Sequence, residues 1–177
     1  LSSRDFYVSI NLSARDVAMT RFLDILKIQL TDAAIPHQCI AIEATERGFL
    51  DAGAAKDSMS EYRKAGFRIL IDDFGTGYSS LSYLQDLEVD VLKIDKSFVD
   101  TINAEAVTSG VIPHIIAMAA QLELKIVAEG VENEGQAKYL ADRGVQYGQG
   151  WLFAKAMPAE QFLEWLTLRD NEAGSLA

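Results

Sequence analysis

The chain has 177 residues, of which 49% are hydrophobic and 24% charged, and its formal net charge is −10. This length and balance are typical of one globular domain with its own core. The acidic charge argues against binding to a nucleic-acid polymer or to an anionic membrane surface. Cys39 is the single cysteine, which excludes an internal disulfide. We therefore expect a cytoplasmic domain, whether or not its parent protein is anchored in a membrane.

Short strand-like segments alternate with longer segments of helical period. The expected strands are Phe6–Asn11, Cys39–Thr45, Phe67–Asp72, Val91–Ile94, Lys125–Ala128 and Tyr147–Phe153. The expected helices are Ala14–Ala34, Ala54–Ala65, one starting near Ser79, Glu105–Leu122, Glu132–Arg143 and Ala159–Thr167. This alternation predicts parallel βαβ units with strands buried on both faces. Pro113 predicts that the fourth helix starts late or kinks there.

Polar residues fall at the carboxyl end of nearly every expected strand: Asn11, Glu43, Asp72, Asp73, Lys93, Asp95, Glu129 and Gln149. A doubly wound sheet concentrates its ligand at one switch point, whereas the loops after all strands of a (β/α) barrel build the site. We therefore predict an α/β fold of the TIM-like barrel type. An eight-stranded barrel needs about 250 residues, so about six units indicate an incomplete barrel whose opening units lie upstream. We assign residues 1–170 to its C-terminal three-quarters and residues 171–177 to a tail.

The segment ILIDDFGTGYSS carries two adjacent acids, Asp72 and Asp73, directly after a buried strand. Adjacent carboxylates raise each other's pKa unless a cation neutralises them. Two metal ions roughly 4 Å apart would do so, with one carboxylate bridging them. The alternative is a pair of turn-forming acids before Gly75.

Three further residues offer oxygen ligands. Asn11 supplies an amide oxygen that suits Mg²⁺ or Mn²⁺, or it caps the following helix, a role that Ser13 could share. Glu43 is a metal ligand or a structural acid paired with an arginine. Glu129 can bind metal, act as a general base, or do both.

The remaining candidates surround these ligands. Lys93 either pairs with nearby acids, Asp95 among them, or orients an attacking water and stabilises charge on phosphate oxygens. Gln149 could donate to a phosphate oxygen or cap neighbouring backbone. Glu46 and Glu132 are placed to support loops. Because no Ser–His or Cys–His arrangement accompanies these groups, the implied chemistry is metal-activated water attacking a phosphodiester.

Six motifs, in the order SINLSA, IEATE, IDDFGTGYSSLSYL, LKIDKSFV, VAEGVE and QGWLF, resemble the EAL domain of bacterial cyclic-di-GMP signalling. The resemblance covers essentially the whole chain. It implies a TIM-like barrel that hydrolyses cyclic di-GMP to linear pGpG with Mg²⁺ or Mn²⁺ and is inhibited by Ca²⁺. It also implies a homodimer and upstream sensory or GGDEF-type domains in the parent protein.

The resemblance also implies roles for single residues. The implied metal set is Asn11, Glu43, Asp72, Asp73 and Glu129, with Glu129 also as general base. Lys93 is similar to the lysine that contacts the catalytic water, and Gln149 and Ser13 are candidates for substrate binding. The loop with Phe74, Gly75, Thr76 and Gly77 resembles one that links metal occupancy to the dimer interface. Glu46 resembles the acid that anchors this loop, and Glu132 is similar to a glutamate of uncertain role.

One departure concerns the Glu-Ala-Leu segment that names the family, with its metal-binding glutamate and a nearby arginine. Neither is present, because the chain begins after that region. We therefore expect the 177-residue chain alone to bind metal poorly and to hydrolyse slowly. A catalytically silent cyclic-di-GMP receptor is the alternative function, and an unrelated metal-dependent barrel such as an enolase-type lyase is a third. The intact Asp72, Asp73, Gly75 and Gly77 favour the enzyme.

Overall fold

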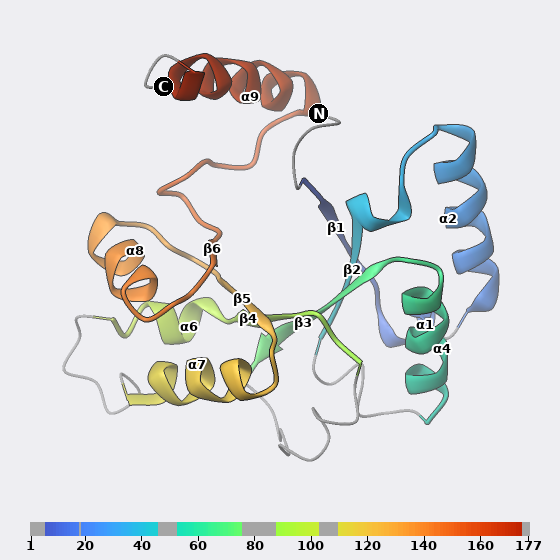
Figure 1. Ribbon diagram of the computed structural model, residues 1–177, viewed down its shortest axis with the longest axis horizontal. Coiled ribbons are helices and arrows are strands. Elements are labelled where there is room, and N and C mark those ends of the chain that lie inside the picture. Colours follow the sequence, from blue (N-terminus) through green and yellow to red (C-terminus); the bar gives the residue numbers. More distant parts are fainter. Residues whose placement is uncertain (1–5, 18, 46–52, 76–87, 103–109, 175–177) are drawn as a thin grey trace.

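Six parallel strands form one curved sheet in the computed structural model, which describes residues 6–17, 19–45, 53–75, 88–102 and 110–174. The strands are β1 (Val8–Asn11), β2 (Ile40–Thr45), β3 (Arg68–Phe74), β4 (Val91–Ile94), β5 (Lys125–Ala128) and β6 (Tyr147–Gly148). Each strand pairs with the next one along the chain. Figure 1 shows the sheet curling into part of a barrel with helices around it. The predicted α/β fold, an incomplete TIM-like barrel, is confirmed.

Helices follow the strands and cover the convex side of the sheet. They are α1 (Ala14–Val17), α2 (Thr20–Asp32), α4 (Gly53–Lys64), α6 (Lys96–Val99), α7 (Val111–Gln121), α8 (Glu134–Ala141) and α9 (Ala159–Gly174), with a 3₁₀ turn at His37–Cys39. Helix α9 lies apart from the sheet, close to the N-terminal end (Figure 1). There, the rings of Phe6 and Phe162 have centroids 6.1 Å apart. Among the described residues, no helix combines the length and apolarity that crossing a membrane requires.

Several elements differ from their expected bounds. The single helix expected over Ala14–Ala34 is two helices, because Met19 adopts an extended backbone between them. Helix α7 begins at Val111, so Pro113 lies in its first turn, where proline is tolerated, and the expected start at Glu105 lies outside the described residues. Strand β6 is shorter than expected, and α6 was not expected. The helix expected near Ser79 lies outside the described residues.

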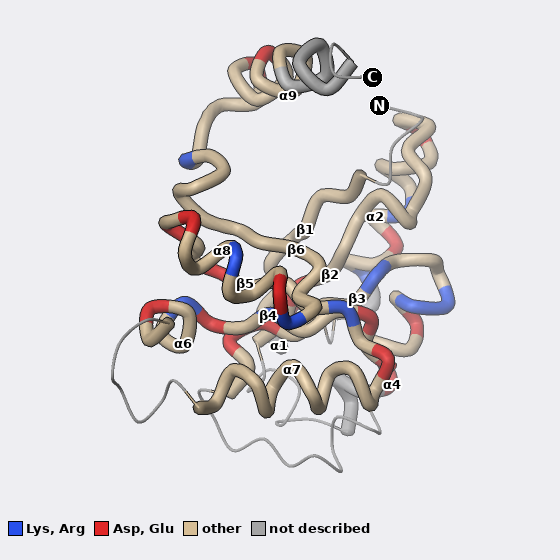
Figure 2. Tube along the Cα trace, turned by 60° about the vertical axis from the view of Figure 1, so that its left-hand side comes forward, with Lys and Arg blue, Asp and Glu red and all other residues tan. Residues whose placement is uncertain are grey.

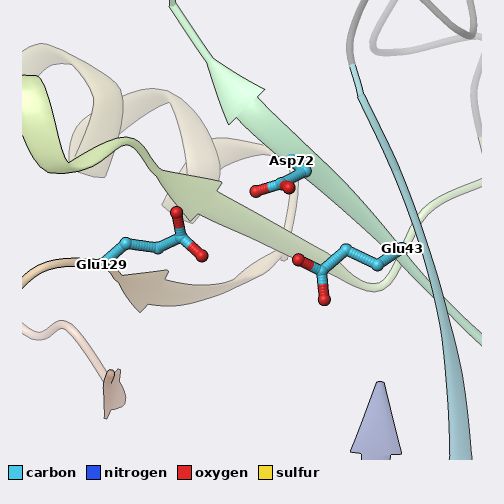
Figure 3. A group of neighbouring side chains, drawn as sticks. All are labelled: Glu43, Asp72 and Glu129. Carbon is cyan, nitrogen blue, oxygen red and sulfur yellow. The ribbon is translucent and has the colours of Figure 1, made fainter. Parts of the chain in front are cut away.

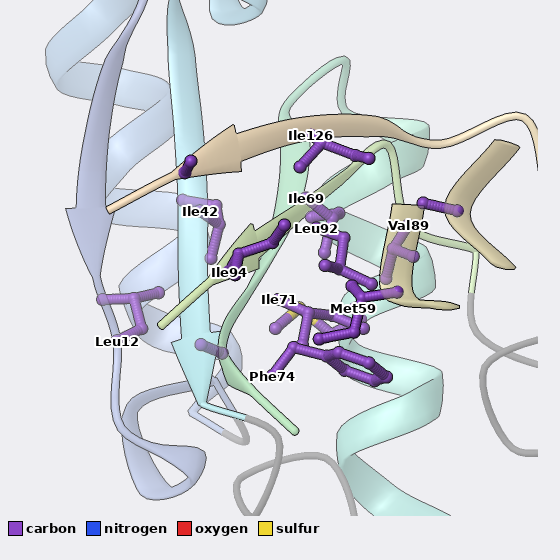
Figure 4. Packing of buried hydrophobic residues seen from close by; sticks show 14 of the residues in the cluster. Leu12, Ile42, Met59, Ile69, Ile71, Phe74, Val89, Leu92, Ile94 and Ile126 are labelled. Carbon is purple, nitrogen blue, oxygen red and sulfur yellow. The ribbon is translucent and has the colours of Figure 1, made fainter. Parts of the chain in front are cut away.

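The two faces of the sheet have different partners because side chains alternate along each strand. Ile42, Ile69, Ile71, Leu92 and Ile94 point outward into the core shared with the helices (Figure 4). Full burial of each such side chain contributes roughly 1.5–3 kcal/mol. The inner face carries a second, smaller cluster, made of Ala41, Leu70, Val91 and Val127.

Charge is distributed unevenly over the helices. The segment from Val111 to Gln121 contains no lysine, arginine, aspartate or glutamate, and α7 is therefore uniformly tan in Figure 2. Its Ile112, Ile115 and Ala119 are buried against the sheet. Other helices do carry acids, such as Glu61 in α4, Glu134 in α8 and Glu160 in α9 (Figure 2).

Candidate metal centre

Glu43, Asp72 and Lys93 each follow an inner-face hydrophobic residue by two positions. Because side chains alternate with a period of two, these polar groups continue the inner face toward the carboxyl ends of β2, β3 and β4. Glu129 comes directly after β5, and its N–H donates to the carbonyl of Ile94, 3.0 Å away. The sheet therefore brings residues far apart in the sequence to one place inside the barrel.

Lys93 is the centre of this group, with only 4% of its side chain exposed. Its ammonium nitrogen contacts Glu43 Oε1 and lies 3.0 Å from Asp72 Oδ1 and 2.5 Å from Glu129 Oε1. Figure 3 shows the three carboxylates pointing toward a common centre. One positive charge faces three acids, so the ionised cluster carries an excess of negative charge that a bound cation would neutralise.

Asp72 shows most directly how burial and neighbouring acids affect a carboxyl group of this centre. Burial raises the pKa of Asp72 to about 6, with further increases from the charges of Glu129, Asp73 and Asp95, although a backbone hydrogen bond at Asp73 opposes them. Asp72 Oδ1 is buried and accepts no hydrogen bond, despite its 3.0 Å distance from the Lys93 ammonium. A buried carboxylate oxygen that shares a single ammonium group with two other acids is well placed to bind a metal ion.

Asp73 reaches the inner side of the barrel through an irregularity in β3. The register between β3 and β4 shifts between Ile71 and Phe74, and Asp73 has a φ of +54°. In a regular strand, adjacent acids would point to opposite faces, whereas a bulge re-aims one of them. Aspartate tolerates the left-handed region better than most residues do. The bulge therefore allows Asp73 to join Asp95 and Glu129 in an acidic group.

Two groups of acids fit metal binding. One contains Glu43, Asp72 and Glu129, and the other contains Asp73, Asp95 and Glu129; within each, the ligand oxygens lie within 4.8 Å of one another. Glu129 belongs to both. An all-oxygen donor set suits hard cations such as Mg²⁺, Mn²⁺ and Ca²⁺. The residues present therefore fit a metal site, and the shared carboxylate fits a pair of ions.

The other candidates lie around this centre. Asn11 is opposite Glu43 in the β1–β2 register, so both side chains face the same side of the sheet. Ser13 is a helix cap: its hydroxyl accepts the Asp16 N–H and donates to the Asp16 carboxylate. Gln149 follows β6 and is exposed, and its N–H donates to Ala128 O over 2.8 Å.

Asp95, Phe74 and Gly75 have structural roles. Asp95 was a possible partner of Lys93, but it caps α6 by accepting the Ser97 N–H at 3.0 Å. Phe74 is buried in the core, and Gly75 has a φ of +93°. A Cβ at Gly75 would lie 3.0 Å from the Phe98 ring. The rest of this loop, with Thr76 and Gly77, and the acid Glu46 lie outside the described residues.

A curved parallel sheet with a lysine and carboxylates at its carboxyl ends defines a (β/α)-barrel protein with an oxygen-lined centre. The chain matches the EAL domain over residues 1–156, and it belongs to that family.

Individual relatives agree with this membership. PdeB of Escherichia coli, named a probable cyclic di-GMP phosphodiesterase, is 50% identical over 159 residues, covering 90% of this chain and 30% of PdeB. The PaMucR phosphodiesterase in complex with c-di-GMP has a TM-score of 0.84 at 37% identity, covering 89% of this chain and 64% of that one. A manganese and cyclic di-GMP complex of Klebsiella pneumoniae BlrP1 has a TM-score of 0.79 at 27% identity, covering 87% and 40%. The chain thus spans under a third of PdeB's length.

Proposed function

We propose that the domain hydrolyses cyclic di-GMP to linear pGpG in a metal-dependent reaction. The observation that carries this proposal is the buried Lys93, whose single ammonium group is shared by the carboxylates of Glu43, Asp72 and Glu129. Membership of the EAL family supplies the substrate class. Mg²⁺ or Mn²⁺ would be held by Glu43, Asp72, Asp73 and Glu129, with Asn11 beside them, and when bound would activate water and stabilise phosphate charge.

Side chains of the protein carry out the proton transfer and bind the phosphate oxygens. Water attacks phosphorus and the bond from phosphorus to the 3′ oxygen of one sugar breaks; this oxygen takes up a proton from solvent and becomes a hydroxyl, which opens the ring to pGpG. Glu129 lies at the junction of both acidic groups and accepts the proton of the attacking water. The Lys93 ammonium stabilises negative charge on the phosphate oxygens. Gln149, at the exposed end of β6, donates to a phosphate oxygen.

The silent receptor has less support. Glu43, Asp72, Asp73 and Glu129 are all present, and the structure brings them into two groups that share Glu129. A receptor needs no such concentration of repelling carboxylates, which costs stability unless cations bind. We further propose that Ca²⁺ binds the same oxygens and inhibits, since it favours more ligands and a more flexible geometry than Mg²⁺ does.

The experiment is a hydrolysis assay of the protein at its natural length. Cyclic di-GMP is incubated with Mg²⁺ or Mn²⁺, and pGpG is measured by chromatography; Asp72→Asn is the site variant and Asp142→Asn, an exposed acid paired with Lys138, is the control. We expect pGpG from the natural protein and the control, and a loss of at least about 100-fold with Asp72→Asn. Binding without hydrolysis would support the receptor, and neither binding nor hydrolysis would refute the proposal.

Homodimer formation and upstream signalling domains are further proposals from the family. Sedimentation velocity of the natural-length protein, with and without Mg²⁺ and cyclic di-GMP, tests the dimer. A monomer at all micromolar concentrations would refute it.

A further inference from the structure

The loop after β5, residues 130–133, directly follows Glu129. Glu129 is the last residue of this segment that donates a backbone hydrogen bond to β4, with 3.0 Å from its N–H to Ile94 O. Beyond it the chain turns at Gly130, whose φ is +67°. Because Glu129 belongs to both acidic groups, a small movement of this loop would displace a ligand of each.

Backbone hydrogen bonds hold this loop on its β6 side. The Val131 N–H donates to Gln149 O, and the Leu152 N–H donates to Val131 O, each over 3.0 Å. Val131 is 1% exposed and packs in the core. These hydrogen bonds hold the side of the loop that faces β6, and they do not involve its opposite side.

On the opposite side, the side chain of Lys96 covers the loop. A Cβ built at Gly130 would lie 2.3 Å from Lys96 Cγ, so the lysine stem occupies the space above the glycine. The Lys96 ammonium then donates to Glu132 Oε1 at 2.9 Å and to Asp100 Oδ1 at 2.7 Å. The hydrogen bonds to Asp100 and Glu132 raise the pKa of Lys96 above its ordinary value.

Glu132 is itself held from a second helix. Its N–H donates to Gln136 Oε1 at 2.8 Å, and Gln136, which is 6% exposed, reaches the carbonyl of Val99 at the end of α6. Lys96, Glu132 and Gln136 therefore join α6, the loop and α8 into one connected unit. Lys138 in α8 and Asp142 directly after it form an ordinary exposed pair at 2.9 Å.

We propose that Lys96 is a positioning residue for the metal centre: its stem over Gly130 and its ion pair with Glu132 hold Glu129 in both acidic groups. This inference rests on the proposed function, because it assumes that Glu129 binds the metal. An exposed ion pair adds little to overall stability. Groups that orient a metal ligand, by contrast, change metal affinity by about 10–100-fold when removed.

The sign of the effect separates positioning from plain electrostatics. Lys96 is a cation near an acidic centre, so removing its charge should tighten cation binding if only charge matters. If Lys96 acts through the position of Glu129, removing its charge should weaken binding. Lys96→Met is the informative variant, because methionine keeps an apolar stem above Gly130 while losing both ion pairs.

The test measures Mn²⁺ affinity by electron paramagnetic resonance titration of the protein at its natural length. We expect about tenfold weaker binding for Lys96→Met, nearly natural affinity for Lys96→Arg, and no change for the matched control Lys138→Met. Glu132→Gln should weaken Mn²⁺ binding similarly. The double variant Lys96→Met/Glu132→Gln should bind Mn²⁺ no more weakly than either single variant, since both substitutions remove the same Lys96–Glu132 ion pair.

Each outcome decides between the claims. Absence of Mn²⁺ binding in the natural protein refutes the metal centre of the proposed function. Natural Mn²⁺ binding with equal or tighter binding in Lys96→Met overturns the positioning role and leaves the proposed function standing. If circular dichroism shows that Lys96→Met does not fold, Lys96→Gln, which also removes the positive charge, carries the test, and equal or tighter binding in that variant overturns the inference.

Discussion

The ammonium nitrogen of Lys93 lies 3.0 Å from Asp72 Oδ1, but that buried oxygen accepts no hydrogen bond. The two residues come from adjacent strands, β4 and β3, and face the inside of the barrel. Lys93 also pairs with Glu43 and Glu129, so one lysine is shared by three acids. This sharing makes the centre incomplete without a cation, and the first three predictions follow from it.

Replacing Lys93 with methionine should destabilise the metal-free protein by about 3 kcal/mol, because three carboxylates would lose their only close cation among the described residues. Urea unfolding in EDTA measures this change. The control Lys138→Met removes an exposed charge and should change the free energy of unfolding by less than about 1 kcal/mol. Equal stability of the Lys93 variant and the natural protein would contradict the central role of Lys93.

The stability of the metal-free protein should depend on the protonation of Asp72. Its folded pKa of about 6 lies above its ordinary value of 3.8, so the folded state binds this proton more tightly than the unfolded chain does. The resulting stabilisation is fully present below about pH 4 and is lost as the pH rises through about 6. Asp72→Asn should remove this component, so that the variant exceeds the natural protein in melting temperature at pH 7 in EDTA.

Thermal melts from pH 4 to pH 8 test the Asp72 prediction. Asp142→Asn serves as the control because Asp142 is an exposed acid paired with Lys138. A difference between Asp72→Asn and the natural protein that stays constant across this pH range would show that Asp72 titrates normally.

Mn²⁺ should stabilise the folded protein by mass action. At a free concentration 100 times its Kd, the gain is about 2.7 kcal/mol, or roughly 5–10 °C in melting temperature for a domain of this size. EDTA should reverse the shift, and Glu43→Gln should reduce it because Glu43 supplies one of the clustered oxygens. Glu61→Gln, which alters an exposed acid beside Lys64, is the matched control. An undiminished shift in the Glu43 variant would remove Glu43 from the ligand set.

Gly150 should not tolerate alanine. A Cβ there would lie 2.2 Å from Val131 O and 2.4 Å from Val131 N, and these are backbone atoms that cannot rotate away. We expect Gly150→Ala to cost about 1–3 kcal/mol and to impair hydrolysis by displacing the neighbouring Gln149. Gly110→Ala meets no atom within 4 Å and should change the melting temperature little. Equal melting temperatures for the two variants would contradict the close packing of the β6 and β5 loops.

Most strands could be predicted from local pattern, whereas helix details were less predictable. The expected strands Cys39–Thr45, Phe67–Asp72 and Val91–Ile94 agree with β2, β3 and β4 to within two residues at each end, because buried parallel strands need continuous apolar sequence. Helix α6 was missed, although Asp95 is a residue type favoured at helix N-caps and could have indicated it. Strand β6 is short because the chain turns at Gly150 against Val131, a contact between distant residues.

The sequence by itself determined the parallel α/β fold and the acids at the strand ends, because strand alternation and residue type are properties of the covalent chain. Only the tertiary structure decided how these groups meet. Asp73 lies in the acidic centre because of a bulge and a positive φ. The register of neighbouring strands determines which acids lie within ion-pair distance of Lys93. The contact of Lys96 with Gly130 depends on how α6 packs beside the loop. Such relationships depend on distances of a few ångströms between segments far apart in the chain, which only packing fixes.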